Sequence, residues 1–225
     1  MNLELLCKKI SYTIKNQIEI DEEKRSIIEY GLFAFLHMGI SILSILIVGS
    51  VFSVAIESLI ISCIIAILRK FSGGAHASTP INCAIVGILI SVFPAYLGKN
   101  INLNVNYIIL LGILIYIVSF IIIYKLAPVD SPNKPIKKEE KIKKLKKGSI
   151  TILCIYMIVV LFNIIIYYIN RKNLMLVYSL CIYIGIAWQV FTLTKIGHSV
   201  VNIIDSLLIK IFTFKGGKNN EKNKQ

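Results

Sequence analysis

The apolar residues of this chain gather into long blocks rather than into the short periodic patterns of a soluble protein. Of the 225 residues, 56% are hydrophobic, and six blocks reach the roughly 17 to 25 residues that a helix needs to cross a bilayer. The blocks cover approximately residues 29–49, 51–68, 81–98, 105–124, 150–169 and 174–194. The sequence therefore predicts an all-α polytopic membrane protein, with about six transmembrane helices over residues 29–194.

The boundaries of this membrane domain follow from the intervening residues. Only Gly49-Ser50 separates the first two blocks, and Gly-Ser offers a turn, so we expect a tight helical hairpin rather than one helix of excessive length. Residues 1–28 lack the continuous apolar core of a signal peptide. They favour an amphipathic helix in the membrane interface, because apolar residues recur near helical spacing between lysines, at Leu3, Leu6, Ile10, Ile14 and Ile18.

The basic residues indicate how the chain is oriented. Twenty-two of the 25 Lys and Arg residues lie in alternate segments, namely the N-terminal segment, the loops 69–80 and 125–149, and the tail 195–225. By the positive-inside rule these segments face the cytoplasm. We therefore expect a multi-pass protein of the cell membrane, with both termini and the loop 69–83 on the cytoplasmic side.

The loop 125–149 holds the densest part of a net charge of +13. Its lysines have two interpretations. They enforce topology and contact anionic lipids, at about 1 kcal/mol each near the surface, or they also attract an acidic partner. Nucleic acid is a poor candidate for that partner, because the basic run lacks the interleaved aromatic residues that stack on bases.

The loop RKFSGGAHASTPINC, residues 69–83, carries the candidate chemistry in His76 and Cys83. In a continuous helix these two residues would be about 10.5 Å apart along the axis, out of hydrogen-bond reach. The chain must therefore fold back, and Gly73-Gly74 permits this because glycine accepts positive φ. Thr79-Pro80 is typical of an N-cap followed by proline at the first helical position.

This start would place Cys83 in the first turn of the third span. There the positive end of the helix dipole favours a thiolate. If the loop folds back, His76 would form a thiolate–imidazolium ion pair with Cys83. The simpler interpretation is a solvated histidine and an apolar filler cysteine, with Arg69 and Lys70 as ordinary anchors at a span end. Two ligands do not make a zinc site, and the chain has no HExxH or CxxC motif, so we expect no metal and no cofactor.

The pattern Arg69, Gly73-Gly74, His76-Ala77 and Cys83 resembles the signature of the accessory gene regulator B family, membrane cysteine endopeptidases of Gram-positive quorum-sensing systems. The likeness extends over essentially the whole chain, including a basic loop near its middle. The resemblance implies that His76 and Cys83 are the catalytic residues. It also implies that Arg69 and Gly74 are needed for activity, with Gly73 in support.

The resemblance further implies a substrate. This would be a precursor peptide with an amphipathic helix, a central cysteine and an acidic C-terminal tail, whose candidate contacts are Lys134, Lys137 and Lys138. Cys83 would cleave off the tail through a thioester, and the substrate cysteine would then close a thiolactone; the sequence does not distinguish closure from hydrolysis. Besides membrane lipids, the resemblance favours a second copy of the chain as partner, in a homodimer.

Two further polar residues and two other functions stay open. Glu57 lies too far from the cytoplasmic end of its span for catalysis, which favours a polar contact between helices, with peptide passage as a lesser role. Gln189 lies at a depth suited to supporting an oxyanion. A small transporter or scaffold, or a membrane acyltransferase, would also fit the number of spans, but neither needs Cys83.

Overall fold

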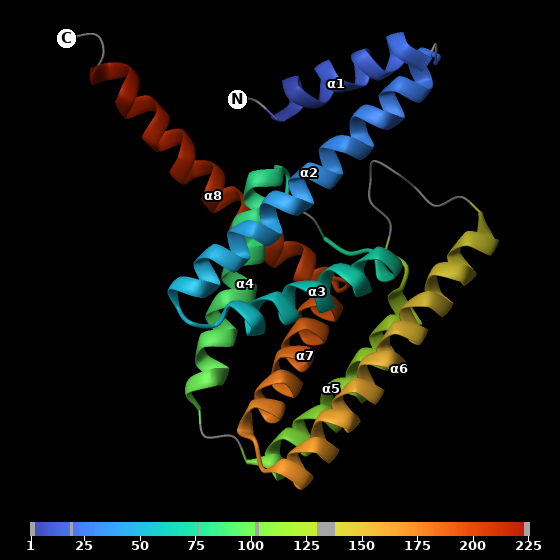
Figure 1. Cartoon of the computed structure of the whole chain (residues 1–225), viewed down its shortest axis with the longest axis vertical. Coiled ribbons are helices and arrows are strands. Elements are labelled where there is room, and N and C mark those ends of the chain that lie inside the picture. The colour runs from blue at the N-terminus through green and yellow to red at the C-terminus, as the bar shows by residue number, and fades with distance from the viewer. Residues whose placement is uncertain (1–2, 19, 76, 102–103, 130–137, 223–225) are drawn as a thin grey trace. The chain divides into compact units, whose positions relative to one another are not determined.

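The computed structural model describes residues 3–18, 20–75, 77–101, 104–129 and 138–222, with side chains as far as residue 211. Over these residues the chain forms eight helices. They are α1 (Leu3–Ile18), α2 (Glu22–Val51), α3 (Ala55–Ser72), α4 (Pro80–Asn100), α5 (Val105–Leu126), α6 (Glu139–Asn170), α7 (Asn173–Phe191) and α8 (Lys195–Lys222) (Figure 1). The prediction of an all-α polytopic membrane protein is confirmed.

Five of the described helices are long and apolar enough to cross a membrane, namely α2, α4, α5, α6 and α7. The predicted span 51–68 falls on α3, which is not one of the five. Within its 18 residues α3 carries three charged side chains, those of Glu57, Arg69 and Lys70. The sixth span therefore stays a prediction.

The turn before α3 lies later than the sequence predicts. Helix α2 continues through Gly49 and Ser50, and the chain turns at residues 52–54, where Ser53 has φ +58°. Gly49 serves a close approach instead, because a Cβ at this position would lie 2.9 Å from the Cα of Ala55. A helix tolerates an isolated glycine at a cost of roughly 1 kcal/mol, so the Gly-Ser pair alone does not end it.

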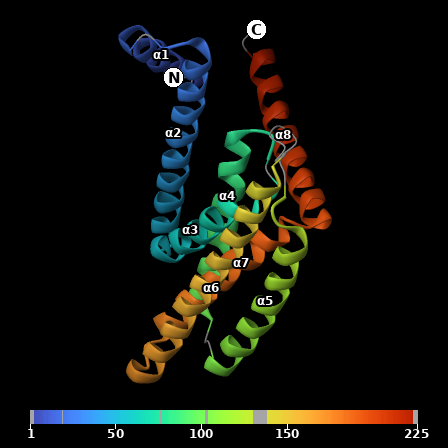
Figure 2. The same cartoon turned by 90° about the vertical axis from the view of Figure 1, so that its right-hand side faces the viewer.

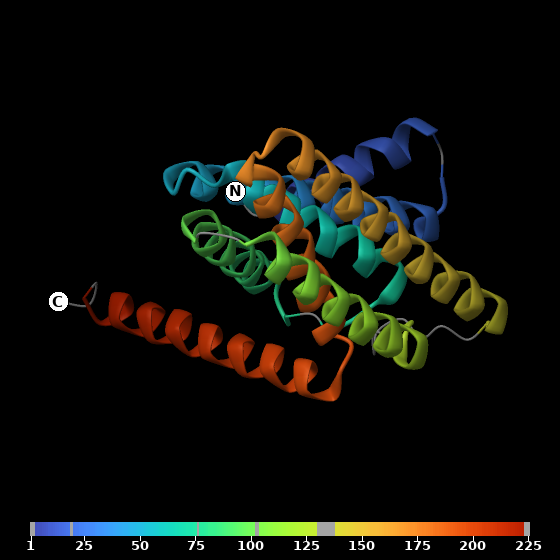
Figure 3. The ribbon, with the colours of Figure 1, turned by 90° about the horizontal axis from the view of Figure 1, so that it is seen from below.

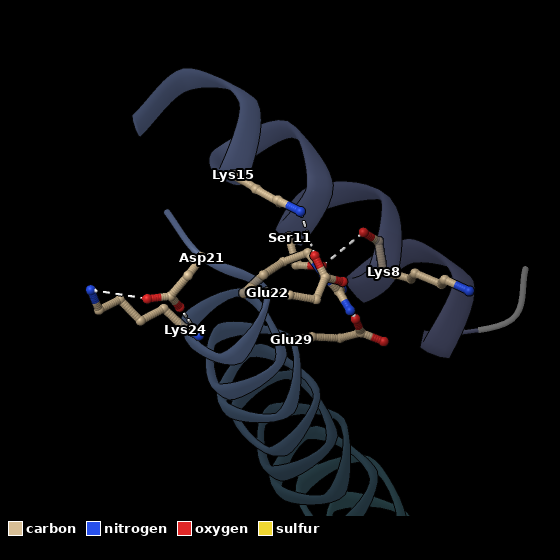
Figure 4. Close-up of polar contacts among 8 residues, drawn as sticks. Lys8, Ser11, Lys15, Asp21, Glu22, Lys24 and Glu29 are labelled. Carbon is tan, nitrogen blue, oxygen red and sulfur yellow. Dashed lines mark hydrogen bonds and ion pairs between the residues drawn. The ribbon is translucent and has the colours of Figure 1, made fainter. Parts of the chain in front are cut away.

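The chain divides into two compact units, residues 1–44 and 45–225. In the first unit, α1 packs against the first turns of α2 through polar side chains (Figure 4). The guanidinium of Arg25 donates to Ser11 Oγ at 3.1 Å, forms ion pairs with Glu22 and Glu29, and lies over the ring of Tyr12. The predicted N-terminal helix is confirmed, and its location in the membrane interface stays a prediction.

In the second unit, α5, α6 and α7 run beside one another, and α3 crosses the direction of α7 steeply (Figures 1 and 2). Helix α3 packs on α4, α6 and α7. The apolar core between these helices includes the fully buried side chains of Leu68, Ile123, Leu176 and Ile186. This core fixes the C-terminal end of α3, from which the candidate loop departs.

Two segments predicted as loop or tail are helical. Helix α6 begins at Glu139, so residues 139–149 of the basic loop extend the following span as one helix. Lysine and glutamate are good helix formers, and Glu139 and Glu140 in the first turn complement the helix dipole. The tail after residue 194 forms α8, which contacts α4 and otherwise extends away from the other helices of the unit (Figure 3).

Candidate active site

Cys83 lies in the first turn of α4, as the sequence predicts. Pro80 is the first residue of the helix, and Thr79 caps it by accepting a hydrogen bond from the Asn82 backbone N–H at 3.2 Å. The Cys83 backbone N–H donates to the Thr79 carbonyl oxygen at 3.0 Å, which closes the first helical turn. The cap thus determines where the Cys83 side chain leaves the helix.

The Gly73-Gly74 pair ends α3 and reverses the chain. Both residues have positive φ, +69° and +128°, as predicted. Gly73 pairs with Val129, whose N–H donates to the Ser72 carbonyl oxygen at 2.9 Å. A Cβ at Gly73 would lie only 2.0 Å from the Val129 carbonyl oxygen. Only glycine therefore lets the start of the basic loop, which follows α5, lie against the candidate loop.

The C-terminal end of α7 holds this loop from the other side. The buried amide of Gln189 donates to the Gly73 carbonyl oxygen at 2.7 Å and to Ser72 Oγ at 3.0 Å. The Ala75 N–H donates to the Thr192 carbonyl oxygen at 3.1 Å. Gln189 was a candidate oxyanion donor, but its N–H groups are engaged with the loop, and it does not line the cavity beside Cys83. Its observed role is to hold Gly73.

Cys83 opens into a cavity of about 100 Å³ that α3, α4, α7 and α8 enclose with the loop. Its polar lining includes the Cys83 thiol and Arg69. The Arg69 guanidinium lies close enough to the thiol for an electrostatic interaction, and its buried Nε has no hydrogen-bond partner among the described residues. The rest of the lining is Ile65, Ala75, Ala77, Val86, Gly87, Ile90, Trp188, Thr192 and Val201.

Helix α8 contributes a carboxylate that the sequence interpretation missed. Asp205 Oδ2 accepts from the Ser78 backbone N–H at 3.1 Å, and Oδ1 accepts from Asn82 Nδ2 at 2.8 Å. Hydrogen bonds from Ser78 and then from Asn82 lower the pKa of this buried carboxyl. The signal in the sequence is an aspartate within the apolar run IIDSLL, residues 203–208, of an otherwise basic tail.

The remaining candidates divide into two groups. His76, Lys134 and Lys137 lie outside the described residues, so the encounter of His76 with Cys83 stays a prediction. Lys138 is exposed just before α6 and does not line the cavity. Of the predicted site residues, the structure therefore brings Arg69 and Cys83 together, with Gly73 and Gly74 shaping the loop between them.

Glu57 is paired at the other end of α4. Its Oε1 lies 3.3 Å from Lys99 Nζ, which also donates to the Ser53 carbonyl oxygen at 2.5 Å. Lys99 lies sixteen positions after Cys83, about 24 Å along a helix. The polar contact between helices that the sequence favoured for Glu57 is confirmed.

Comparisons with known proteins agree over most of the chain. A family model described as accessory gene regulator B matches residues 7–193. A "Putative AgrB-like protein" of Clostridium perfringens strain SM101 is 41% identical over 212 residues, which are 93% of this chain and 99% of that relative.

Two more distant relatives match a smaller part of the chain. The "Accessory gene regulator protein B" of Staphylococcus aureus is 31% identical over 153 residues, which are 64% of this chain and 78% of that protein. "Protein FsrB" of Enterococcus faecalis is 27% identical over 157 residues, 68% of this chain and 64% of that protein. No solved structure matches. The family match includes Arg69 and Cys83 but ends before α8.

Proposed function

Because the chain belongs to the accessory gene regulator B family, we propose that it is a membrane cysteine endopeptidase that processes a quorum-sensing precursor peptide. One observation carries the proposal: the Cys83 thiol shares a cavity with Arg69 and with Ala75 and Ala77, the sequence neighbours of His76. A nucleophile, a cationic donor and a loop that carries a candidate base are the parts that acyl transfer by a thiol requires.

In the proposed reaction the Cys83 thiolate attacks the carbonyl carbon at the junction of signal and tail. His76 accepts the thiol proton and then gives it to the departing amine. Arg69 supports both steps, because its positive charge favours the thiolate and its unpartnered Nε–H is available to the developing oxyanion. The tail leaves with a free amine, and the signal segment remains on Cys83 as a thioester.

The second proposed step releases the signal peptide. A cysteine thiolate of the substrate attacks the thioester carbonyl, Cys83 leaves as a thiolate, and a thiolactone ring closes. One thioester replaces another, so the exchange needs no ATP. Water attacking the same thioester would release a linear acid, and the mass of the product distinguishes the two outcomes.

The proposed substrate has an amphipathic helix, a central cysteine and an acidic tail. The helix would lie on the cytoplasmic leaflet, and the tail would be attracted to the lysines of the basic loop, among them Lys134, Lys137 and Lys138. The exposed lysines in the first turns of α6 extend this positive surface. We also propose a homodimer, with both termini and the loop 69–83 on the cytoplasmic side.

Co-expression with candidate precursor peptides, followed by mass spectrometry of the products, tests the proposal. Loss of the truncated product in both Cys83→Ser and His76→Ala, at wild-type protein levels in the membrane, would support it. Cys154→Ser is the matched control, because Cys154 is an exposed free thiol on α6 outside the cavity. If Cys83→Ser still yields the truncated peptide at the wild-type level, the proposal is wrong, and a transporter or scaffold is favoured.

A further inference from the structure

We propose that Asp205 is a positioning residue, through which α8 holds the first turn of α4 and directs the Cys83 thiol into the cavity. The inference rests on the proposed function, because it assigns Asp205 a part in the reaction of that thiol. Asp205 lies beyond residues 7–193, which the family model matches. The assignment therefore comes from the geometry of this chain.

The two carboxylate oxygens of Asp205 accept hydrogen bonds from residues on both sides of the helix cap. Ser78, whose backbone N–H is bound, precedes the cap residue Thr79, and Asn82, whose side-chain amide is bound, follows it within the first turn. Asn82 is only 3% exposed and Asp205 only 8% exposed. A charged carboxylate with both oxygens engaged holds its partners more firmly than a neutral acceptor would, because charge-assisted hydrogen bonds are the stronger ones.

Fixing Asn82 also fixes Cys83. The two are consecutive in a helical turn, so a rotation of Asn82 about the helix axis would carry Cys83 with it. A displacement of about 1 Å at a reacting atom is enough to cost roughly 100-fold in rate. The hydrogen bonds of Asp205 restrict that rotation, since they join the turn to a different helix.

Helix α8 also shapes the cavity itself. Val201 is 4% exposed and belongs to the cavity lining, and it lies one helical turn before Asp205 on the same face of α8. One face of α8 thus lines the cavity through Val201. Through Asp205 the same face forms the hydrogen bonds, called the clamp below, that hold the turn carrying Cys83. A shift of α8 would alter both.

The chemistry of the clamp requires a carboxylate. Two N–H donors converge on Asp205, one on each oxygen. An asparagine at this position would offer one acceptor oxygen and one NH₂ group. The NH₂ group would face one of the two N–H donors, from Ser78 or Asn82, and that hydrogen bond would be lost. The negative charge also interacts favourably with the N-terminal end of α4. Asp205→Asn is therefore expected to behave much like Asp205→Ala.

The first experiment measures kcat and KM for precursor cleavage by the full chain in membranes. In Asp205→Ala and Asn82→Ala we expect kcat to fall by about 10- to 100-fold, with KM within twofold, because the substrate-binding surface is unchanged. The double variant should fall no further than either single one, since both changes remove the same link. Ser206→Ala is the matched control, because Ser206 is the exposed neighbour of Asp205.

A second arm separates positioning from a general loss of folding. The reversed pair Asn82→Asp with Asp205→Asn restores both hydrogen bonds, since the new amide on α8 would accept from the Ser78 N–H and donate to the new carboxylate on α4. We expect this double variant to recover at least about tenfold of the lost kcat. A kcat within twofold of wild type in Asp205→Ala, in membranes where Cys83→Ser is inactive, would overturn the inference and leave the peptidase proposal intact.

A third arm does not depend on peptidase activity. Alkylation of Cys83 by a water-soluble maleimide, resolved by mass spectrometry of its peptide, reports the access and orientation of the thiol. We expect Asp205→Ala to change this rate by about threefold or more, while Ser206→Ala, which alters the exposed neighbouring residue, leaves it as in wild type. If wild type processes no peptide, the peptidase proposal fails, and this rate alone decides the inference. An unchanged Cys83 rate contradicts it.

Discussion

The two ends of α4 use their polar side chains in different ways. At the C-terminal end, the Glu57 carboxylate is paired with Lys99, which also bonds the Ser53 carbonyl oxygen. At the N-terminal end, a thiol and a guanidinium face a cavity, and the buried Nε of Arg69 has no partner among the described residues.

This difference separates a structural polar contact from a candidate site. A buried polar group without a partner costs free energy, so a fold that keeps one beside a nucleophile retains it for something other than stability. The Glu57–Lys99 pair leaves no such group unsatisfied. Substitutions at the C-terminal end should therefore affect stability, and those at the N-terminal end should affect activity.

The largest expected effect is that of Arg69→Gln on activity. Loss of the guanidinium beside Cys83 should lower kcat by about 100-fold or more, as removal of an oxyanion donor does in other enzymes. The measurement is precursor cleavage at equal protein levels. The matched control is Lys70→Gln, which removes the same charge from the exposed neighbouring residue. Equal losses in the two variants would show that only the net charge of the surface matters.

Gly73→Ala should come next, through the geometry of the loop. The added Cβ would meet the Val129 carbonyl oxygen at 2.0 Å, and φ +69° is unfavourable for alanine. We expect cleavage to fall by at least about tenfold. Gly39→Ala is the control, because a Cβ there meets no atom within 4 Å. Full activity of Gly73→Ala would mean that the pairing with Val129 is dispensable.

At the opposite end of α4, the two halves of the ion pair should differ in what their removal costs. The Glu57 side chain is 6% exposed and that of Lys99 is 42% exposed. Lys99→Met leaves a buried carboxylate unpaired and should destabilise the fold by about 3 kcal/mol. Glu57→Gln leaves a lysine that water still reaches and should cost about 1 kcal/mol.

Unfolding of each variant in detergent measures these costs, and cleavage per folded molecule should stay within about twofold of wild type. A selective loss of activity in Glu57→Gln, with unchanged stability, would remove the distinction between the two ends. It would also revive the lesser role in peptide passage.

The smallest expected effect is a pH dependence at Asp205. Its hydrogen bonds hold the pKa below the ordinary value of 3.8, so their contribution to stability is present above pH 3.8. It is lost as the pH falls through the lower value of the folded state. The unfolding midpoint of Asp205→Ala should lie about 2 to 4 °C below that of wild type at pH 6, and the gap should narrow as the pH falls below 3.8. A gap that stays constant over this range would argue against an ionised clamp.

The features that the sequence predicted well depend on short stretches of chain. Thr79-Pro80 specifies the start of α4, and with it the position of Cys83, because a cap and a proline act within one turn. The positive φ of Gly73 and Gly74 is likewise a local property. The extent of the apolar blocks predicted the membrane helices for the same reason.

The features that it missed depend on contacts between distant residues. Asp205 and Asn82 are 123 positions apart, and Gln189 and Gly73 are 116 positions apart. The apolar run IIDSLL around Asp205 indicates that this carboxylate is buried, but it does not indicate which helix it contacts. The turn at residues 52–54 was misplaced for a different reason, since a helix tolerates an isolated glycine and α2 continues through Gly49 and Ser50.

The position of α8 has a practical consequence for anyone who shortens this protein. A chain trimmed to the family match would end at residue 193 and would lack Val201 and Asp205, a cavity wall and a clamp. Such a shortened chain would keep every motif residue but lose the hydrogen bonds of Asp205 to the turn that carries Cys83. Affinity tags and fusion partners are therefore best joined well beyond Asp205, where they do not disturb the contact of α8 with α4.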